Sequence, residues 1–347
     1  MRKLKSRKII PSLLILAMLM SSMMLVACNG GGGSSDGDGP QTLTIYTSMK
    51  ESKMGDIVRA FNAQYPDIRV EHYSAGAGRL MARIAAEREA GQIQVDLLWH
   101  SEVPVFYGLA ADGMLHHFIP EARANNEIIC ILDEPSPYFT TARLGALGVI
   151  YNTNHIQTPP TVWDDLLDPK WYGGFAIANP SLSGTALISI AMFEQYRGQD
   201  FFRALRANGH MVGGGSGQVV DDTAIGEYFG ALAVDYIVYD VIDLGATVGM
   251  AWPSDGYIVI PSPVAIFRES PNIPAAETFL NFLLSPAGQQ IIADNATTPV
   301  RPGMYMAERF NLPSVEDMAE NAMRLDFVAM TDDRERIIND FMAIMQD

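Results

Sequence analysis

The sequence predicts an α/β fold of two lobes joined by two extended crossover strands. Residues 43–99 alternate strand, helix, strand, helix and strand, which is typical of a mostly parallel sheet covered by helices. Two apolar runs, 143–152 and 248–252, are interpreted as extended segments that flank a central block. About 320 residues remain after the N-terminal leader described below, enough for about two domains.

The elements before residue 100 follow from hydrophobic periodicity. Residues 43–48 and 68–73 alternate apolar and polar side chains, as half-buried strands do. Apolar residues at i, i+3, i+4 and i+7 from Met54 predict a helix, which the segment 65–67 ends. A second helix is expected at 79–90, and a short buried strand at 95–99.

The remaining elements are read in the same way. Helices are expected at 185–197, 201–207 and 219–229, with a Gly-rich break at 213–217, strands at 231–234 and 258–268, helices at 275–284 and from 286, and two more helices in 314–347. The first lobe is therefore predicted at 41–139 and 251–305, the second lobe at 140–250, and C-terminal helices at 306–347. The carboxyl ends of the strands would face a cleft between the lobes.

The N-terminus has the pattern of a secretory signal. Basic residues among the first eight precede an apolar run that ends at Ala27. The last residues of this run, together with Cys28, resemble a bacterial lipobox, which favours cleavage before a lipid-bearing Cys28 over an uncleaved membrane anchor. We expect a signal peptide at 1–27 and a Gly- and Ser-rich flexible tether at 28–40.

Charge and cysteine content exclude several classes of protein. Cleavage removes five of the 24 basic residues and no acidic residue, which leaves 19 basic against 40 acidic residues, a net charge of −21. Nucleic acid is therefore an unexpected partner, because neutralising phosphates needs an excess of Lys and Arg. Cys130 is the only cysteine besides Cys28, so neither a disulfide framework nor a cysteine metal site is expected.

Several short motifs, in order, resemble one family. They are Tyr46-Thr47-Ser48, Val95-Asp96-Leu97-Leu98-Trp99, Val149-Ile150-Tyr151-Asn152, Leu167-Asp168-Pro169-Lys170-Trp171, Pro180-Ser181-Leu182-Ser183-Gly184-Thr185 and Leu283-Leu284-Ser285-Pro286-Ala287-Gly288-Gln289. Together they resemble the type 2 periplasmic binding proteins of ABC importers, in the branch that binds ferric iron, thiamine, sugar phosphates and phosphonates. The resemblance covers the chain from Thr42 to about Asp294.

The resemblance implies a substrate-binding lipoprotein that passes a small ligand to an ABC permease and ATPase. It implies a type 2 periplasmic-binding-protein fold, no cofactor and no catalysis. The expected location is outside the cell membrane, on the outer face or on the periplasmic side of a two-membrane cell, anchored by lipid on Cys28. We expect a monomer.

The first candidate ligand positions are loops after strands. Thr47 and Ser48 stand where a strand passes into a helix, so hydroxyls and free backbone N–H groups favour anions or sugar hydroxyls. A plain helix cap explains the same residues equally well. Gly76 and Ala77 lie in a loop whose small residues let the backbone approach a ligand, although a simple turn is an equal alternative.

The most informative stretch comprises Ser181, Ser183, Gly184 and Thr185. Two serine hydroxyls, a glycine and a threonine stand at the start of a predicted helix, where the helix dipole is positive. This arrangement suits a phosphate or carboxylate. A cap alone needs only one such residue.

Asp235 and Tyr236 form a further candidate. Ferric-iron members of the family carry an adjacent tyrosine pair in this region. Here only Tyr236 matches, and Tyr239 lies three residues further on, which weakens the hypothesis of a ferric-iron site. Asp235 would accept hydrogen bonds from hydroxyls or an amine. Ser101 after the third strand and Asp255 after the second crossover complete the candidate set.

We expect the ligand to be a small oxyanion or organophosphate, although the net negative charge slows the arrival of anions. Alternatives are ferric-iron binding with Tyr236 and Tyr239, or a ligand-sensing lipoprotein for a receptor kinase. A secreted enzyme is the weakest hypothesis, because outside the Gly- and Ser-rich tether at 28–40 the sequence contains no hydrolase, zinc-protease or phosphate-loop motif.

Overall fold

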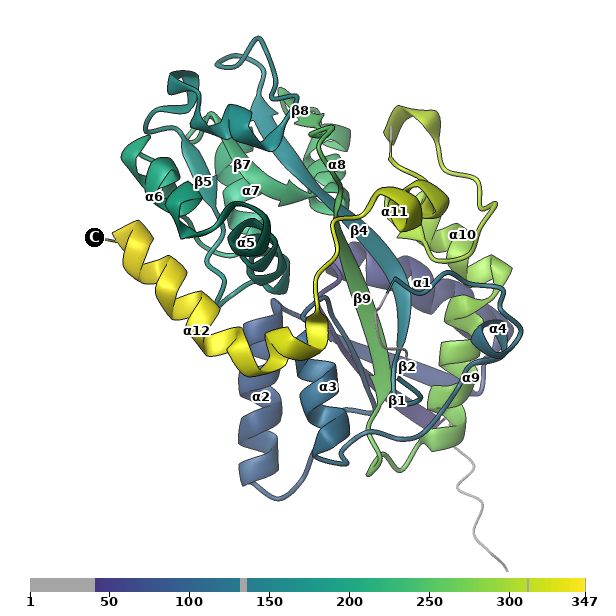
Figure 1. Cartoon of the computed structure of the whole chain (residues 1–347). Helices are drawn as coiled ribbons and strands as arrows, with labels where there is room; N and C mark the ends of the chain where they lie inside the picture. The colour runs from purple at the N-terminus through teal and green to yellow at the C-terminus, as the bar shows by residue number, and fades with distance from the viewer. Residues whose placement is uncertain (1–40, 132–135, 311, 347) are drawn as a thin grey trace, which may run out of the picture. The chain divides into compact units, whose positions relative to one another are not determined.

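The computed structural model describes residues 41–131, 136–310 and 312–346, which belong to one compact unit (Figure 1). The predicted signal peptide, the lipidated Cys28 and the tether lie outside the described residues. A mixed sheet runs through the unit in the order β2-β1-β3-β9-β4-β7-β5-β6. None of the helices in the described ranges is both long and apolar enough to cross a membrane.

The N-terminal elements form the predicted parallel arrangement. Strand β1 (Gln41–Thr47) pairs in parallel with β2 (Ile68–Ser74) and with β3 (Leu97–Trp99). Helix α1 (Glu51–Gln64) follows β1 and buries the apolar face that begins at Met54. Helix α2 (Ala77–Glu89) starts two residues earlier than predicted.

The two crossovers are present and lie side by side. Strand β4 (Thr140–Asn152) pairs antiparallel with β8 (Val248–Ala251) along one end and with β9 (Ile258–Ile266) along the other. Strand β9 also pairs antiparallel with β3. The centre of the sheet is therefore antiparallel, and only its flanks are parallel as the sequence predicted.

The central block forms the other flank of the sheet. Strand β5 (Phe175–Ile177) pairs in parallel with β6 (Met211–Val212) and β7 (Gly230–Val234), and β7 lies antiparallel to β4. Its helices are α5 (Gly184–Arg197), α6 (Gln199–Ala207), α7 (Ser216–Ala224) and α8 (Asp235–Asp243).

Two of these helices differ from the prediction. Helix α7 starts inside the Gly-rich segment and ends five residues before residue 229, because the chain turns at Gly226 with a φ of 87°. Helix α8 was not predicted. Its run of Ile237, Val238 and Tyr239 has strand propensity, but these side chains are buried against the core, so tertiary packing overrides local preference.

The remaining helices cover the sheet. They are α3 (Val103–Ala111), α4 (Glu121–Ala124), α9 (Ile273–Leu284), α10 (Pro286–Asp294), α11 (Val315–Asn321) and α12 (Phe327–Gln346), with short 3-10 turns at Trp163–Leu167, Pro169–Trp171 and Glu308–Phe310, and a two-residue strand, β10 (Thr298–Pro299), beside β4. The last helix, yellow in Figure 1, lies against α3 as well as α5 and α6.

Two large hydrophobic cores separate along the sheet. One core joins α1 to α9, with the rings of Phe61 and Phe279 centred 5.0 Å apart. The other lies around α5 and includes Trp163, Phe193 and Phe341 of α12. Two cores on either side of the crossovers agree with a two-lobed architecture; the predicted residue boundaries of the lobes stay a prediction.

Candidate ligand-binding site

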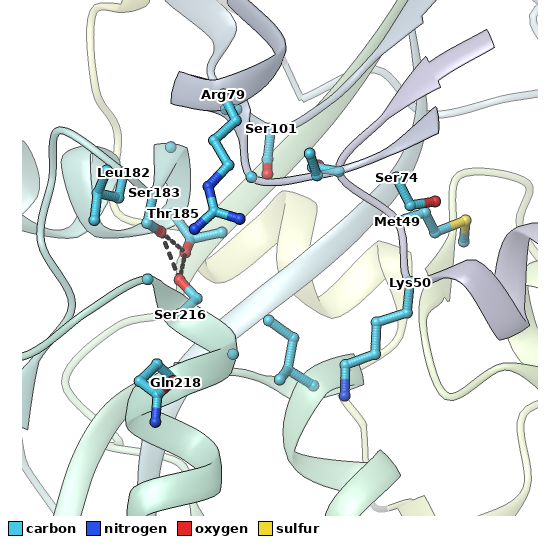
Figure 2. A pocket seen from close by; sticks show the side chains of 18 of the residues that line it. Met49, Lys50, Ser74, Arg79, Ser101, Leu182, Ser183, Thr185, Ser216 and Gln218 are labelled. Atoms are coloured by element: carbon cyan, nitrogen blue, oxygen red, sulfur yellow. Dashed lines mark hydrogen bonds between the residues drawn. The ribbon is translucent and has the colours of Figure 1, made fainter. Parts of the chain in front are cut away.

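A cavity of about 630 Å³ lies where the N-termini of five helices meet (Figure 2). One side, which we call the first wall, comes from residues before β4: Ser48, Met49, Lys50, Glu51, Ser74, Ala75, Gly76, Ala77, Arg79 and Ser101. The opposite side, the second wall, comes from residues after β5: Leu182, Ser183, Gly184, Thr185, Gly214, Gly215, Ser216, Gly217, Gln218, Tyr236 and Ile237.

The helix ends make the cavity favourable to negative charge. Helices α1, α2 and α7 begin at the cavity with no side chain hydrogen-bonded to their first N–H groups, whereas in α8 the carboxylate of Asp235 accepts from the N–H of Tyr236. Helix α5 is capped by the hydroxyl of Ser183, which accepts from the N–H of Ala186 at 3.1 Å. Free N–H groups and the positive end of each helix dipole suit an anion.

Three hydroxyls form a compact cluster on the second wall. The Oγ of Ser216, at the start of α7, lies 2.5 Å from Ser183 Oγ and 2.8 Å from Thr185 Oγ1. Ser183 Oγ and Thr185 Oγ1 are 2.9 Å apart. Hydroxyl hydrogens rotate, so the three groups can turn their donors toward an oxyanion.

Arg79 of α2 faces this hydroxyl cluster from the first wall. Figure 2 shows its guanidinium group pointing across the cavity toward Ser183, Thr185 and Ser216. The side chain is exposed and has neither an ion pair nor a hydrogen bond with any residue of the described ranges. The guanidinium's donors are therefore available to a ligand, with geometry suited to a carboxylate or phosphate.

The other charged residues of the lining are already paired. Lys50 Nζ lies 2.9 Å from a carboxylate oxygen of Asp240. Glu51 is the one carboxylate among the described residues of the lining; its side chain is 74% exposed and lies 3.1 Å from His72. Within the described part of the chain, no three His, Cys, Asp or Glu side chains gather as a metal site would require.

Glycines let the two walls touch beside the cavity. A Cβ added at Gly78 would lie 2.5 Å from the carbonyl oxygen of Ser181, and one at Gly76 would lie 2.9 Å from that of Leu182. A Cβ at Gly184 would lie 2.9 Å from the backbone nitrogen of Glu102. The first turns of α2 and α5 thus approach the opposite wall more closely than any other residue type permits.

Most of the predicted ligand positions lie in the lining. The structure places Ser48, Gly76, Ala77, Ser101, Ser183, Gly184, Thr185 and Tyr236 around the cavity. Four predicted positions lie outside it. Thr47 is fully buried, and its Oγ1 accepts from the N–H of Met49, while Ser181 is exposed at the surface. Asp255 binds Arg197 at 2.5 Å and accepts from the N–H of Trp163.

Asp235 is the fourth residue outside the lining, and its carboxylate is fully buried behind it. Its oxygens accept from the N–H groups of Tyr236 at 2.7 Å and Ala146 at 2.8 Å, so it joins α8 to β4. Burial raises the pKa of Asp235 to about 7, partly offset by these hydrogen bonds and by the charges of Arg143 and Lys53. Its observed role is structural support for Tyr236.

Tyr236 and Tyr239 face different surroundings. Tyr236 lines the cavity, and the guanidinium of Arg143 lies over its ring, 4.1 Å from the ring centroid. Tyr239 packs on Phe310 with ring centroids 5.3 Å apart, and burial, with a smaller contribution from Asp235, raises its pKa to about 12. The two phenols therefore do not form a pair at the cavity.

Sequence reasoning did not select several residues of the lining. Neither Ser216 nor Arg79 is among the positions predicted from the sequence, although both line the cavity. A detectable signal existed for Ser216, since a glycine run followed by a serine often precedes a helix N-terminus. Lys50 and Gln218 carried no such signal.

The family model for "Bacterial extracellular solute-binding protein" matches residues 116–328, more than half of the chain. The chain belongs to this family. Members are binding proteins of the extracellular or periplasmic space that bind small ligands and work with the permease and ATPase of an ABC importer. The family is not an enzyme family.

Solved structures show the same fold as this solute-binding protein. The periplasmic binding protein AfuA from Actinobacillus pleuropneumoniae, with exogenous fructose-6-phosphate bound, has a TM-score of 0.77 and 23% identity over 88% of this chain and 99% of its own. Iron-bound HitA from Pseudomonas aeruginosa has a TM-score of 0.72 and 23% identity, covering 87% of this chain and 99% of its own. The two-lobed type 2 periplasmic-binding-protein fold is confirmed.

Sequence relatives show similarly low identity. An uncharacterized protein of Haemophilus influenzae is 26% identical over 265 residues, which are 72% of this chain and 74% of the relative. A putative 2-aminoethylphosphonate-binding periplasmic protein of Salmonella typhimurium is 22% identical over 238 residues, 65% of this chain and 68% of the relative. The solute-binding protein is thus similar to proteins named for different ligands.

Proposed function

We propose that this chain is the substrate-binding lipoprotein of an ABC importer and captures an organophosphate in the cavity between its two walls. The observation that supports the proposal is the unpaired guanidinium of Arg79 facing three clustered hydroxyls at the N-termini of α5 and α7. Each of these groups donates to oxyanions, and together they exceed what a helix cap needs.

The size of the cavity supports a ligand with an organic body. Pockets for small organic ligands measure about 300–1,000 Å³, a range that includes this cavity of about 630 Å³. Away from Arg79, the lining presents neutral groups such as Ser48, Ser74 and Gln218. Its one carboxylate, Glu51, is exposed and beside His72, so an uncharged polar body fits better than an ammonium group.

Ferric iron is a weaker candidate for the ligand. Ferric iron is a hard ion that prefers several anionic oxygen ligands. In the described lining, Tyr236 and Glu51 are the groups that can supply such oxygens, because Tyr239 packs on Phe310. The fructose-6-phosphate named for AfuA agrees better with this lining than the iron named for HitA.

The remaining parts of the proposal concern location and mechanism. The lipid on Cys28 holds the protein at the outer side of the membrane, where the monomer, which catalyses no reaction, meets the permease. Ligand binding favours a closed arrangement of the lobes, because groups on both walls bind one ligand. The local helix ends and Arg79 outweigh the net negative charge within the closed cavity, where water no longer screens them.

Calorimetry with matched pairs of compounds tests the proposal. We expect glucose 6-phosphate to bind at least about 100-fold more tightly than glucose, since two or more charge-assisted hydrogen bonds depend on the phosphate. 2-Aminoethylphosphonate and ferric citrate serve as competing ligand classes. Tight binding of ferric citrate with no response to any phosphate ester would overturn the proposal.

A further inference from the structure

The last helix lies across the two sides of the cavity. Helix α12 packs on α5 and α6 of the central block, where the rings of Phe341 and Phe202 are centred 5.2 Å apart. It also lies against α3, which follows Ser101 of the first wall. One helix therefore contacts both α5, which contributes to the second wall, and α3, which directly follows the first wall (Figure 1).

Two arginines of α12 make ion pairs in opposite directions. Arg334 Nε binds the carboxylate of Glu102, at the start of α3. Arg336, two residues further along, binds Glu194 of α5 at 2.8 Å and two carboxylates of its own helix, Asp333 and Asp340. Among the described residues, the pair with Arg334 is the only ion pair that joins α12 to the chain before β4.

Glu102 stands at the point where the two walls meet. Its side chain is only 2% exposed, and its backbone N–H donates to His100 Nδ1 at 3.0 Å. The backbone of Gly184 lies directly against it, since a Cβ at Gly184 would be 2.9 Å from both the Cβ and the nitrogen of Glu102. A buried carboxylate needs a partner charge, and Arg334 supplies it here.

We propose that Arg334 is a positioning residue that stabilises the closed arrangement of the walls through Glu102. Arg334 is not among the residues that line the cavity. Its ion pair holds Ser101 of the first wall against the N-terminus of α5 on the second wall, and α12 provides the connection. The proposal rests on the lobe closure in the proposed function, but it makes a statement about the ligand-free protein.

The consequence for binding is a uniform change of affinity. A ligand that binds the closed form has an apparent Kd that increases as the closed fraction falls. Loss of the Arg334 contact should therefore raise the apparent Kd of every ligand by the same factor. Loss of a residue that contacts the ligand would instead weaken ligands selectively.

Hydrogen exchange of the full chain without ligand tests the positioning role. In Arg334→Ala we expect amides of segments 99–103 and 182–187 to exchange about tenfold faster, because an uncompensated Glu102 disfavours the contact. Arg336→Ala is the matched control: it removes ion pairs from the same helix without touching Glu102, and should leave both segments unchanged. Arg334→Lys, which keeps the charge, should restore most of the protection.

Titration with glucose 6-phosphate and glycerol 3-phosphate gives the second readout. Arg334→Ala should weaken both by about the same factor, near tenfold. Equal exchange in the Arg334 and Arg336 variants, or a loss spread over the whole chain, would overturn the positioning role. If neither compound binds the unmodified protein, the proposed ligand class fails, and the exchange result still decides the role of Arg334.

Discussion

Replacing Arg79 with leucine is expected to weaken binding of glucose 6-phosphate by about 10- to 100-fold. A hydrogen bond to a charged group contributes about 1.5–3 kcal/mol, and each 1.4 kcal/mol is a factor of ten in Kd. Arg79 has no partner in the described structure, so its removal leaves no buried group unsatisfied. The melting temperature should therefore change little, while calorimetry should show the weaker binding of glucose 6-phosphate.

The same helix offers a matched control for this prediction. Arg88 stands near the other end of α2 and pairs with Asp112 at the surface, at 3.4 Å. Arg88→Leu removes the same charge from the molecule but should leave the Kd unchanged within a factor of about two, as surface substitutions usually do. Equal weakening in both variants would mean that overall charge, and not contact by Arg79, governs affinity.

The second large effect is expected from Gly78→Ala. The added Cβ would lie 2.5 Å from the carbonyl oxygen of Ser181, so the walls cannot meet as they do in this structure. Overpacking of this kind costs about 1–3 kcal/mol, which corresponds to a loss of affinity of about 5- to 150-fold. The free energy of unfolding should fall by less than the free energy of binding. Alanine favours the first turn of α2, and the clash disappears when the walls separate.

Gly108→Ala provides the control for the added methyl group. Gly108 is also helical, in α3, and apart from its chain neighbours and the backbone of its own helix no described atom lies within 4 Å of the position where its Cβ would be. Calorimetry on both variants measures the effect on ligand affinity, and thermal unfolding measures the effect on folding stability. A Gly78→Ala protein with unchanged affinity would contradict closure by contact of α2 with residues 181–182.

Local sequence patterns predicted most of the fold because its elements are regular. The apolar face that begins at Met54 and the hydroxyl-rich start of α5 are local signals, and both elements formed where expected. The antiparallel centre of the sheet was not predictable from these patterns, since β4 and β9 pair over more than one hundred residues of intervening chain. Helix α8 was missed because burial overrides its strand-like composition.

In the candidate site, too, some residues were predictable from local sequence patterns and others were not. Helix starts such as Ser183 and Gly76 are visible in the sequence as caps and loops, and they line the cavity. Asp255 resembles them locally, yet it pairs with Arg197, a partner that no short motif reveals. The importance of Arg79 depends on the absence of a partner in space among the described residues, a property that spacing along the chain does not encode.

Native mass spectrometry of the protein purified from its own host would identify the ligand without prior assumption. We expect a retained ligand whose mass contains a phosphate or phosphonate group, and which Arg79→Leu protein no longer retains. A retained ferric ion, or a neutral sugar held equally well by both proteins, would contradict it.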